Sequence, residues 1–143
     1  MADVYAPEGM FPSGSERTLG ERITLAILRA EGVAEPGPFH LENTAAFLHL
    51  LPVACFQTAA DATARAVRVQ IVTPPSALSR EGQKQLVSEI TQIVAEVAQD
   101  PTIARATWVL LTEAAEGGWG ISGTAYGRDE FAALARRAAN KTA

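Results

Sequence analysis

Residues 67–98, VRVQIVTPPSALSREGQKQLVSEITQIVAEVA, decide the fold. Apolar residues at 67, 69 and 71 alternate with polar ones, which predicts a strand with one buried face. From Gln83 to Ala98 the apolar residues recur on one face of a helix: Leu86, Val87, Ile90, Ile93, Val94 and Val97. Ser79 is expected to cap this helix, and Asp100-Pro101 to end it.

A second strand is expected immediately after the helix. Residues 107–112, TWVLLT, form a short apolar run typical of a largely buried strand. The segment is therefore β-α-β. A right-handed crossover makes the two strands of such a unit parallel.

The first half of the chain repeats the second. With a shift of 67 residues Pro7 meets Pro74, and the apolar positions of a first helix meet those of the second: Leu19 with Leu86, Ile23 with Ile90, Ala26 with Ile93, Ile27 with Val94, and Ala30 with Val97. A core stripe kept in register across two segments indicates duplication. The first helix is expected over about 15–31, with Ser13 and Glu16 as a capping box, and its strand over about 45–51.

These elements predict an α/β (α+β) fold: two tandem β-α-β units that form a four-stranded sheet with two helices on one face. We expect one domain over 1–143, with unit one at about 2–57, a linker at 58–65, unit two at about 66–125, and a C-terminal helix at about 129–140. The other sheet face is then uncovered although apolar residues lie in these strands, Phe47, Val72, Trp108 and Leu110. Burial by other copies of the chain follows, so an oligomer is expected. A ferredoxin-like module, which needs no partner, is the alternative.

Composition narrows the function. Of the 143 residues 48% are hydrophobic and the net charge is -4, which suits a globular domain and disfavours nucleic acid as a partner. No apolar run is long enough for a membrane span, and no signal peptide is apparent. The single cysteine, Cys55, is expected to be a small buried apolar group and suggests a reducing cytoplasm.

The segment of residues 67–98, followed by VLLTEAAEGGWGISG at 109–123, resembles the 4-oxalocrotonate tautomerase family of the tautomerase superfamily. The features that carry the resemblance are the long helix between two strands and the turn Trp119-Gly120-Ile121-Ser122-Gly123. The resemblance covers about residues 2–125. It implies a fused two-unit chain, a homotrimer, and keto–enol proton transfer on a small keto or enol carboxylic acid, with no organic cofactor and no metal.

The catalytic group of that family is an amino-terminal proline, and this chain has Ala2 in its place. The family proline lies seven residues before the position of Pro7, so an amine on Ala2 is expected about two residues short, on the order of 7 Å at strand rise. Three readings stay open: the Ala2 amine acts as base or Schiff-base nucleophile, another residue acts in the same pocket, or the protein is a non-catalytic relative that binds or assembles. A frayed start is the simplest state for such a terminus.

Candidate substrate-binding residues follow from the resemblance. The family's carboxylate-binding arginines match Leu78 and Trp108, where this chain has none, so Arg105 is the expected substitute beside Trp108. A solvated charge is the plainer reading of Arg105. Trp119 is expected either to line the pocket or to pack at a subunit contact.

Two further residues are candidate proton-transfer groups. Tyr5 lies on the first strand, where its hydroxyl could donate a proton near the amino terminus, or where it is a plain sheet residue. His49 lies in the strand at 47–51 and is either a general base or a satisfied core or interface histidine. His40 is expected in an exposed loop. The two histidines have no carboxylate at ligand spacing, so no metal site is predicted.

Overall fold

The computed structural model describes residues 1–142. Its first half contains β1 (Ala2–Pro7), α1 (Glu16–Ala30), α2 (Pro38–Asn43) and β2 (Ala46–Leu51). The second contains β3 (Val67–Thr73), α3 (Arg80–Val97) and β4 (Thr107–Glu113). A hairpin of β5 (Trp119–Ile121) and β6 (Thr124–Tyr126) and a final helix, α4 (Arg128–Thr142), complete the chain. Two short 3-10 helices, Val53–Cys55 and Pro101–Ala106, precede the linker and β4.

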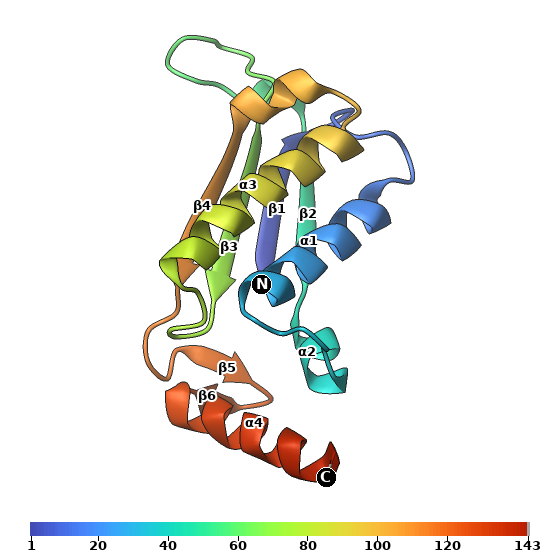
Figure 1. Ribbon diagram of the computed structural model, residues 1–143. Helices are drawn as coiled ribbons and strands as arrows, with labels where there is room; N and C mark the ends of the chain where they lie inside the picture. The colour runs from blue at the N-terminus through green and yellow to red at the C-terminus, as the bar shows by residue number, and fades with distance from the viewer. Residues whose placement is uncertain (143) are drawn as a thin grey trace.

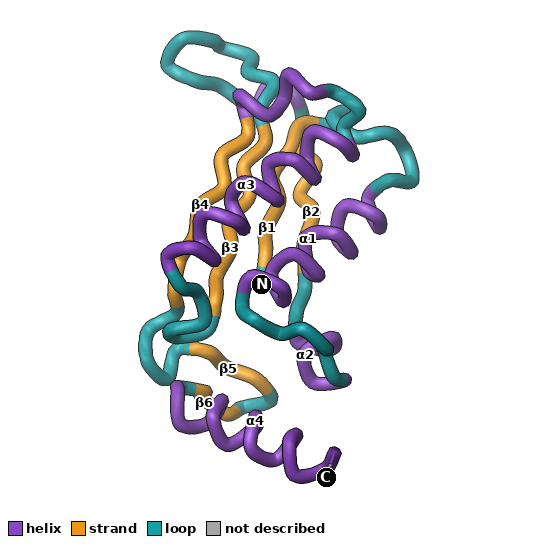
Figure 2. Tube along the Cα trace, in the orientation of Figure 1, coloured by secondary structure: helices purple, strands orange, loops and turns teal. Residues whose placement is uncertain are grey.

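The main sheet confirms the two predicted β-α-β units. Its strand order is β2-β1-β3-β4. The strands within each unit, β1 with β2 and β3 with β4, are parallel, while β1 and β3 are antiparallel at the centre of the sheet. Figures 1 and 2 show that α1 and α3 lie side by side across the same face of this sheet, while the hairpin and α4 lie beyond its lower end.

The core lies between the sheet and these two helices. It contains nine of the ten apolar positions that the repeat aligned: Leu19, Ile23, Ala26 and Ile27 of α1, and Leu86, Ile90, Ile93, Val94 and Val97 of α3. The tenth, Ala30, is partly buried and packs against this core. The strands add alternate residues, such as Val4, Val67, Val69 and Ile71. Outside the core Arg22 and Arg29 of α1 form ion pairs with Glu96 and Glu89 of α3.

The helix starts were predicted unequally well. Ser79 caps α3, because its Oγ accepts a hydrogen bond from the backbone N–H of Gly82 at 3.0 Å. The expected capping box of Ser13 and Glu16 is wrong. The residue before α1 is Ser15, whose hydroxyl donates to the carbonyl of Pro12 at 2.6 Å and makes no cap bond to the helix.

The two units differ in the connection that follows each helix. In unit two it runs over residues 98–106, whereas in unit one it runs over residues 31–45 and contains the extra helix α2. Pro38 stands in the first turn of α2, where a missing N–H costs nothing. The prediction that His40 lies in an exposed loop is therefore wrong, since His40 lies in this helix and is half-buried.

Cys55 also departs from its prediction. It ends the 3-10 turn after β2 and is exposed, not buried. This turn lies beyond the part of β2 that packs against the core, so the Cys55 side chain is not buried.

The second face of the main sheet is uncovered, as predicted. Phe47 is 51%, Trp108 47% and Leu110 44% exposed, and all three lie on strands of this sheet. Within residues 1–142 no helix lies against this face (Figure 1). We name the surface made by Asp3, Tyr5, Phe47, His49, Arg68, Trp108 and Leu110 the open face. None of the helices described is long and apolar enough to cross a membrane.

The open face generates a testable prediction about assembly. A patch of this kind is normally buried by a partner, so the protein is expected to self-associate at micromolar concentration in sedimentation velocity. Trp108→Glu should shift the distribution toward monomer, because it places a charge in the contact. Leu25→Glu changes a residue of similar exposure, 42%, on the helix side and should leave the assembly intact. A wild-type protein that sediments as a monomer would contradict this account of the open face.

Candidate functional site: a cavity at the chain's first residue

The first residue is held at the centre of the sheet. The Met1 amine donates to the carbonyl of Val72 at 3.1 Å, and the Val72 N–H donates to the Met1 carbonyl at 2.9 Å. On the other side the N–H of Ala2 donates to the carbonyl of Ala45 at 2.9 Å. These bonds extend the pairing of β1 with both of its neighbours, so the start of the chain is not frayed.

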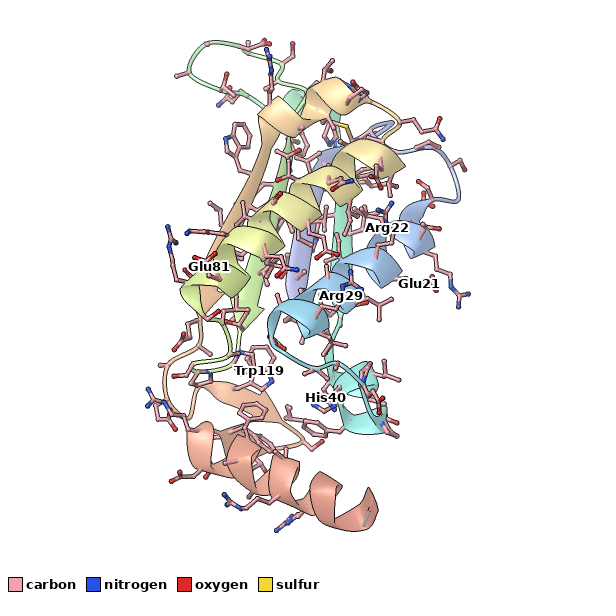
Figure 3. The ribbon with its side chains drawn as sticks, viewed as in Figure 1. Glu21, Arg22, Arg29, His40, Glu81 and Trp119 are labelled. Atoms are coloured by element: carbon pink, nitrogen blue, oxygen red, sulfur yellow. The ribbon has the colours of Figure 1, made fainter. Side chains whose placement is uncertain are left out.

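A cavity of about 50 Å³ has Met1 in its lining. Its wall comes from four parts of the chain: the end of α1, the helix α2, the loop after β3, and the C-terminal hairpin and helix. The apolar lining residues are Ile27, Leu28, Phe39, Pro74, Trp119, Ile121 and Phe131, and the polar ones are Met1, Glu31, His40, Asn43 and Thr44. Figure 3 shows Trp119 on the hairpin and His40 on α2, both below the lower end of the sheet.

Glu31 is placed at the cavity by the end of α1. Gly32 follows it with φ of +80°, a conformation that glycine adopts without steric cost. The N–H of Gly32 then donates to the carbonyl of Arg29 and that of Val33 to Leu28, which closes the helix. Position 31 therefore lies where the last turn of α1 meets the start of β1. The shift of the repeat puts Ala98 at the matching place in unit two.

Burial shifts the pKa values of the amine and of Glu31 in opposite directions. Desolvation lowers the pKa of the Met1 amine, against the smaller opposing effects of the charges on Glu31 and Asp3. Desolvation raises the pKa of the Glu31 carboxyl, and the amine partly offsets the rise. Both groups are thus biased toward their uncharged forms. An unprotonated amine is a base, and a protonated carboxyl is a hydrogen-bond donor.

His40 brings a third polar side chain to the cavity. Its Nδ1 is buried and has no hydrogen-bond partner among the described residues. The ring of Phe39 lies edge-on to that of His40, and Phe39 in turn packs against Tyr126, which packs against Phe131. A buried nitrogen without a partner is costly, which favours a ligand that supplies one. Among the residues described, no group of three or more His, Cys, Asp or Glu side chains is arranged to hold a metal ion.

Two of the sequence candidates bear on this cavity. Trp119 lines it, while its role in substrate binding or at a subunit contact stays a prediction. Ala2 does not line it, because its nitrogen is a peptide N–H bonded to Ala45, and the free amine belongs to Met1. The role of an Ala2 amine stays a prediction for a chain from which Met1 has been removed.

Tyr5 and His49 come together, but on the open face. Their rings stack with centroids 4.4 Å apart, and Asp3 Oδ1 lies 2.7 Å from His49 Nε2. The guanidinium of Arg68 lies over the Tyr5 ring at 5.4 Å. His49 thus has a partner and stays 38% exposed. Neither ring lines the cavity, so any proton-transfer role for them stays a prediction.

Arg105 and Trp108 lie away from the cavity within one chain. Arg105 belongs to the 3-10 helix that precedes β4, and Trp108 lies at the start of β4 beside Arg68. The cavity is instead at the end of β3 and the start of β1, which is the opposite end of the sheet. A substrate contact by Arg105 or Trp108 at this cavity would have to come from another copy of the chain.

The sequence analysis missed Met1 and Glu31. Two signals were available: β1 begins so early that the chain's first residue pairs in the sheet, and Gly32 marks the end of a helix just after an acidic residue. Neither signal shows that the two residues meet, because their approach depends on how β1 pairs with its neighbours.

No protein-family model and no curated protein sequence matches the chain. Solved structures do match its shape. A fused 4-OT wild-type symmetric trimer aligns with a TM-score of 0.74 at 17% identity, over 92% of this chain and 97% of that chain. A native fused 4-OT aligns with a TM-score of 0.69 at 21% identity, over 87% of this chain and 94% of that chain.

The chain has the fold of the fused 4-OT tautomerases. A member of the cis-3-chloroacrylic acid dehalogenase family shares this fold, with a TM-score of 0.71 at 18% identity over 94% of this chain and 90% of that chain. The fold implied by the resemblance seen in the sequence is thereby confirmed. The ferredoxin-like alternative is set aside, because these structures align over both β-α-β units of the chain.

The charge of Glu31 gives a prediction about stability. Its folded pKa lies above the unfolded value, so the fold binds more protons than the unfolded chain between the two values, and stability falls as pH rises through that window. Glu31→Gln should therefore raise the melting temperature at pH 8, and the gain should shrink toward pH 4, where the wild-type carboxyl is protonated in both states. Differential scanning calorimetry at both pH values measures it, with Glu35→Gln, an exposed site, as control. A melting temperature lowered at pH 8 would contradict this reading of Glu31.

Proposed function

We propose that the protein catalyses keto–enol proton transfer on a small keto or enol compound, with the free α-amine at the start of the chain as the base. The observation that carries the proposal is the placement of that amine in a largely apolar cavity, where burial lowers its pKa. A base works best when its pKa lies near the ambient pH, and desolvation brings an amine closer to that value.

The proton balance of the reaction is simple. The unprotonated amine accepts the hydroxyl proton of the enol. As the C=O bond forms, the electron pair of the C=C bond moves to the carbon next to the carbonyl. The resulting ammonium then returns the proton to that carbon, so no proton is gained or lost. The bond from the amine to the Val72 carbonyl uses one N–H and leaves the nitrogen lone pair free for this transfer. No redox partner is required.

The carboxylate expected on the substrate has no cation to bind in this cavity. No arginine or lysine lines it among the residues described. We therefore propose the keto–enol step without requiring a carboxylate on the substrate.

We also propose that the working form is a homotrimer. The open face supports association, and three of the matching fused 4-OT structures are trimers, symmetric or asymmetric. A trimer is also compatible with a second candidate function, in which the protein is non-catalytic and serves a binding or assembly role. Ala2 at the position of the family proline favours that alternative.

An extended amino terminus tests the proposal. Adding Gly-Ser before Met1 converts the amine into a peptide nitrogen, so ketonisation of the methyl ester of phenylenolpyruvate, followed by ultraviolet absorbance, should slow by about 10²–10⁴-fold in kcat/KM, the usual share of a general base. Intact mass shows which residue carries the amine, and sedimentation confirms that the assembly is unchanged.

The outcome separates the candidates. An extended protein as active as the unextended one would exclude the amine as the base. An intact oligomer without turnover in the unextended form would favour the non-catalytic alternative.

A further inference from the structure

We propose that the cavity at Met1 selects uncharged carbonyl or enol compounds over carboxylates, and that Glu31 sets this preference. The inference deepens the proposed function by naming its substrate class, and it rests on that function only for turnover. Ligand selection is a property of the cavity itself and is measured without catalysis.

The charges around the cavity carry the inference. Glu31 is the one acidic side chain in the lining, and no arginine or lysine of the described residues joins it. The nearby cations of α1 are engaged elsewhere, because Arg29 pairs with Glu89 and Arg22 with Glu96 on the outer surface of the helices. A carboxylate that entered would therefore find a carboxyl group of the protein and no guanidinium.

Burial makes the amine a poor substitute for the missing cation, because it lowers the pKa of that group. To act as a base it must be unprotonated, and burial favours that form. In this form it offers N–H donors without a positive charge. A carboxylate would then lose its hydration with no opposite charge to replace it, which is strongly unfavourable in an apolar enclosure. If Glu31 is ionised as well, repulsion adds to the cost.

An uncharged carbonyl meets the opposite situation. The amide of Asn43 and the hydroxyl of Thr44 present hydrogen-bonding groups without a charge at the cavity. The buried Nδ1 of His40, which has no partner, is a further polar atom that a ligand could satisfy. The cavity suits a small ligand group, such as the reacting end of a ketone, aldehyde or enol.

Butyramide and butyrate test the preference, because they share a size and differ in charge. Binding to the whole protein is followed by the shift of the Trp119 indole N–H in two-dimensional NMR, assigned by comparison with Trp108→Phe. We expect butyramide to bind about tenfold more tightly than butyrate near pH 7.5. Glu31→Gln should reduce that ratio by about threefold or more through recovery of butyrate binding. Glu35→Gln removes a nearby exposed carboxylate and should leave the ratio unchanged.

Three results would overturn the inference: tighter binding of butyrate by the wild-type protein, a ratio that Glu31→Gln does not change, or no shift with either ligand up to its solubility limit. The first would indicate that another subunit brings a cation to the cavity. Failure of the proposed function looks different, since a protein that prefers butyramide but turns over no enol would refute catalysis alone. In an active protein, the methyl ester of phenylenolpyruvate should surpass the free acid in kcat/KM.

Discussion

The antiparallel pairing of β1 with β3 determines where Met1 lies in the fold. Ala2 lies opposite Ile71, and the hydrogen bonds between Met1 and Val72 continue the ladder to the first residue. Because the two strands occupy the centre of the sheet, the amine is held at an inner strand end and not at an edge. Every feature of the cavity follows from this placement, since the ends of α1 and β3 and the C-terminal hairpin all meet at the same point.

The cost of this arrangement falls on two ionisable groups. The amine and Glu31 lose hydration together, and each offsets part of the other's shift through its charge. A protein selected for stability alone has no need to enclose such a pair, and active sites are places where burial of this kind recurs. The α2 insertion and the C-terminal hairpin complete the enclosure, with Phe39 on one and Trp119 on the other. Unit two has no counterpart, because its connection is shorter and Ala98 stands where unit one has Glu31.

Much of the fold could be predicted from the sequence because the duplicated core stripe is periodic and long. Residues such as Ile23 and Ile90 repeat in register, and right-handed crossovers leave one arrangement for each unit. The site could not be predicted in the same way. It depends on strand register, on a helix end and on a six-residue insertion, which are local features without periodicity. The position of an Ala2 amine, counted from Pro7, stays a prediction. His40 and Cys55 were misplaced because short helical turns have weak signals.

The fold is expected to hold a buried amine at Met1 whose pKa is lowered by desolvation. Labelling with ¹⁵N-methionine isolates it, because the chain contains two methionines and Met10 contributes only a peptide nitrogen. Titration of the Met1 nitrogen in the assembled protein, with its presence verified by intact mass, should give a midpoint clearly below the usual value of about 8 for such an amine. A midpoint at or above about 8, or a mature chain that has lost Met1, would contradict the account.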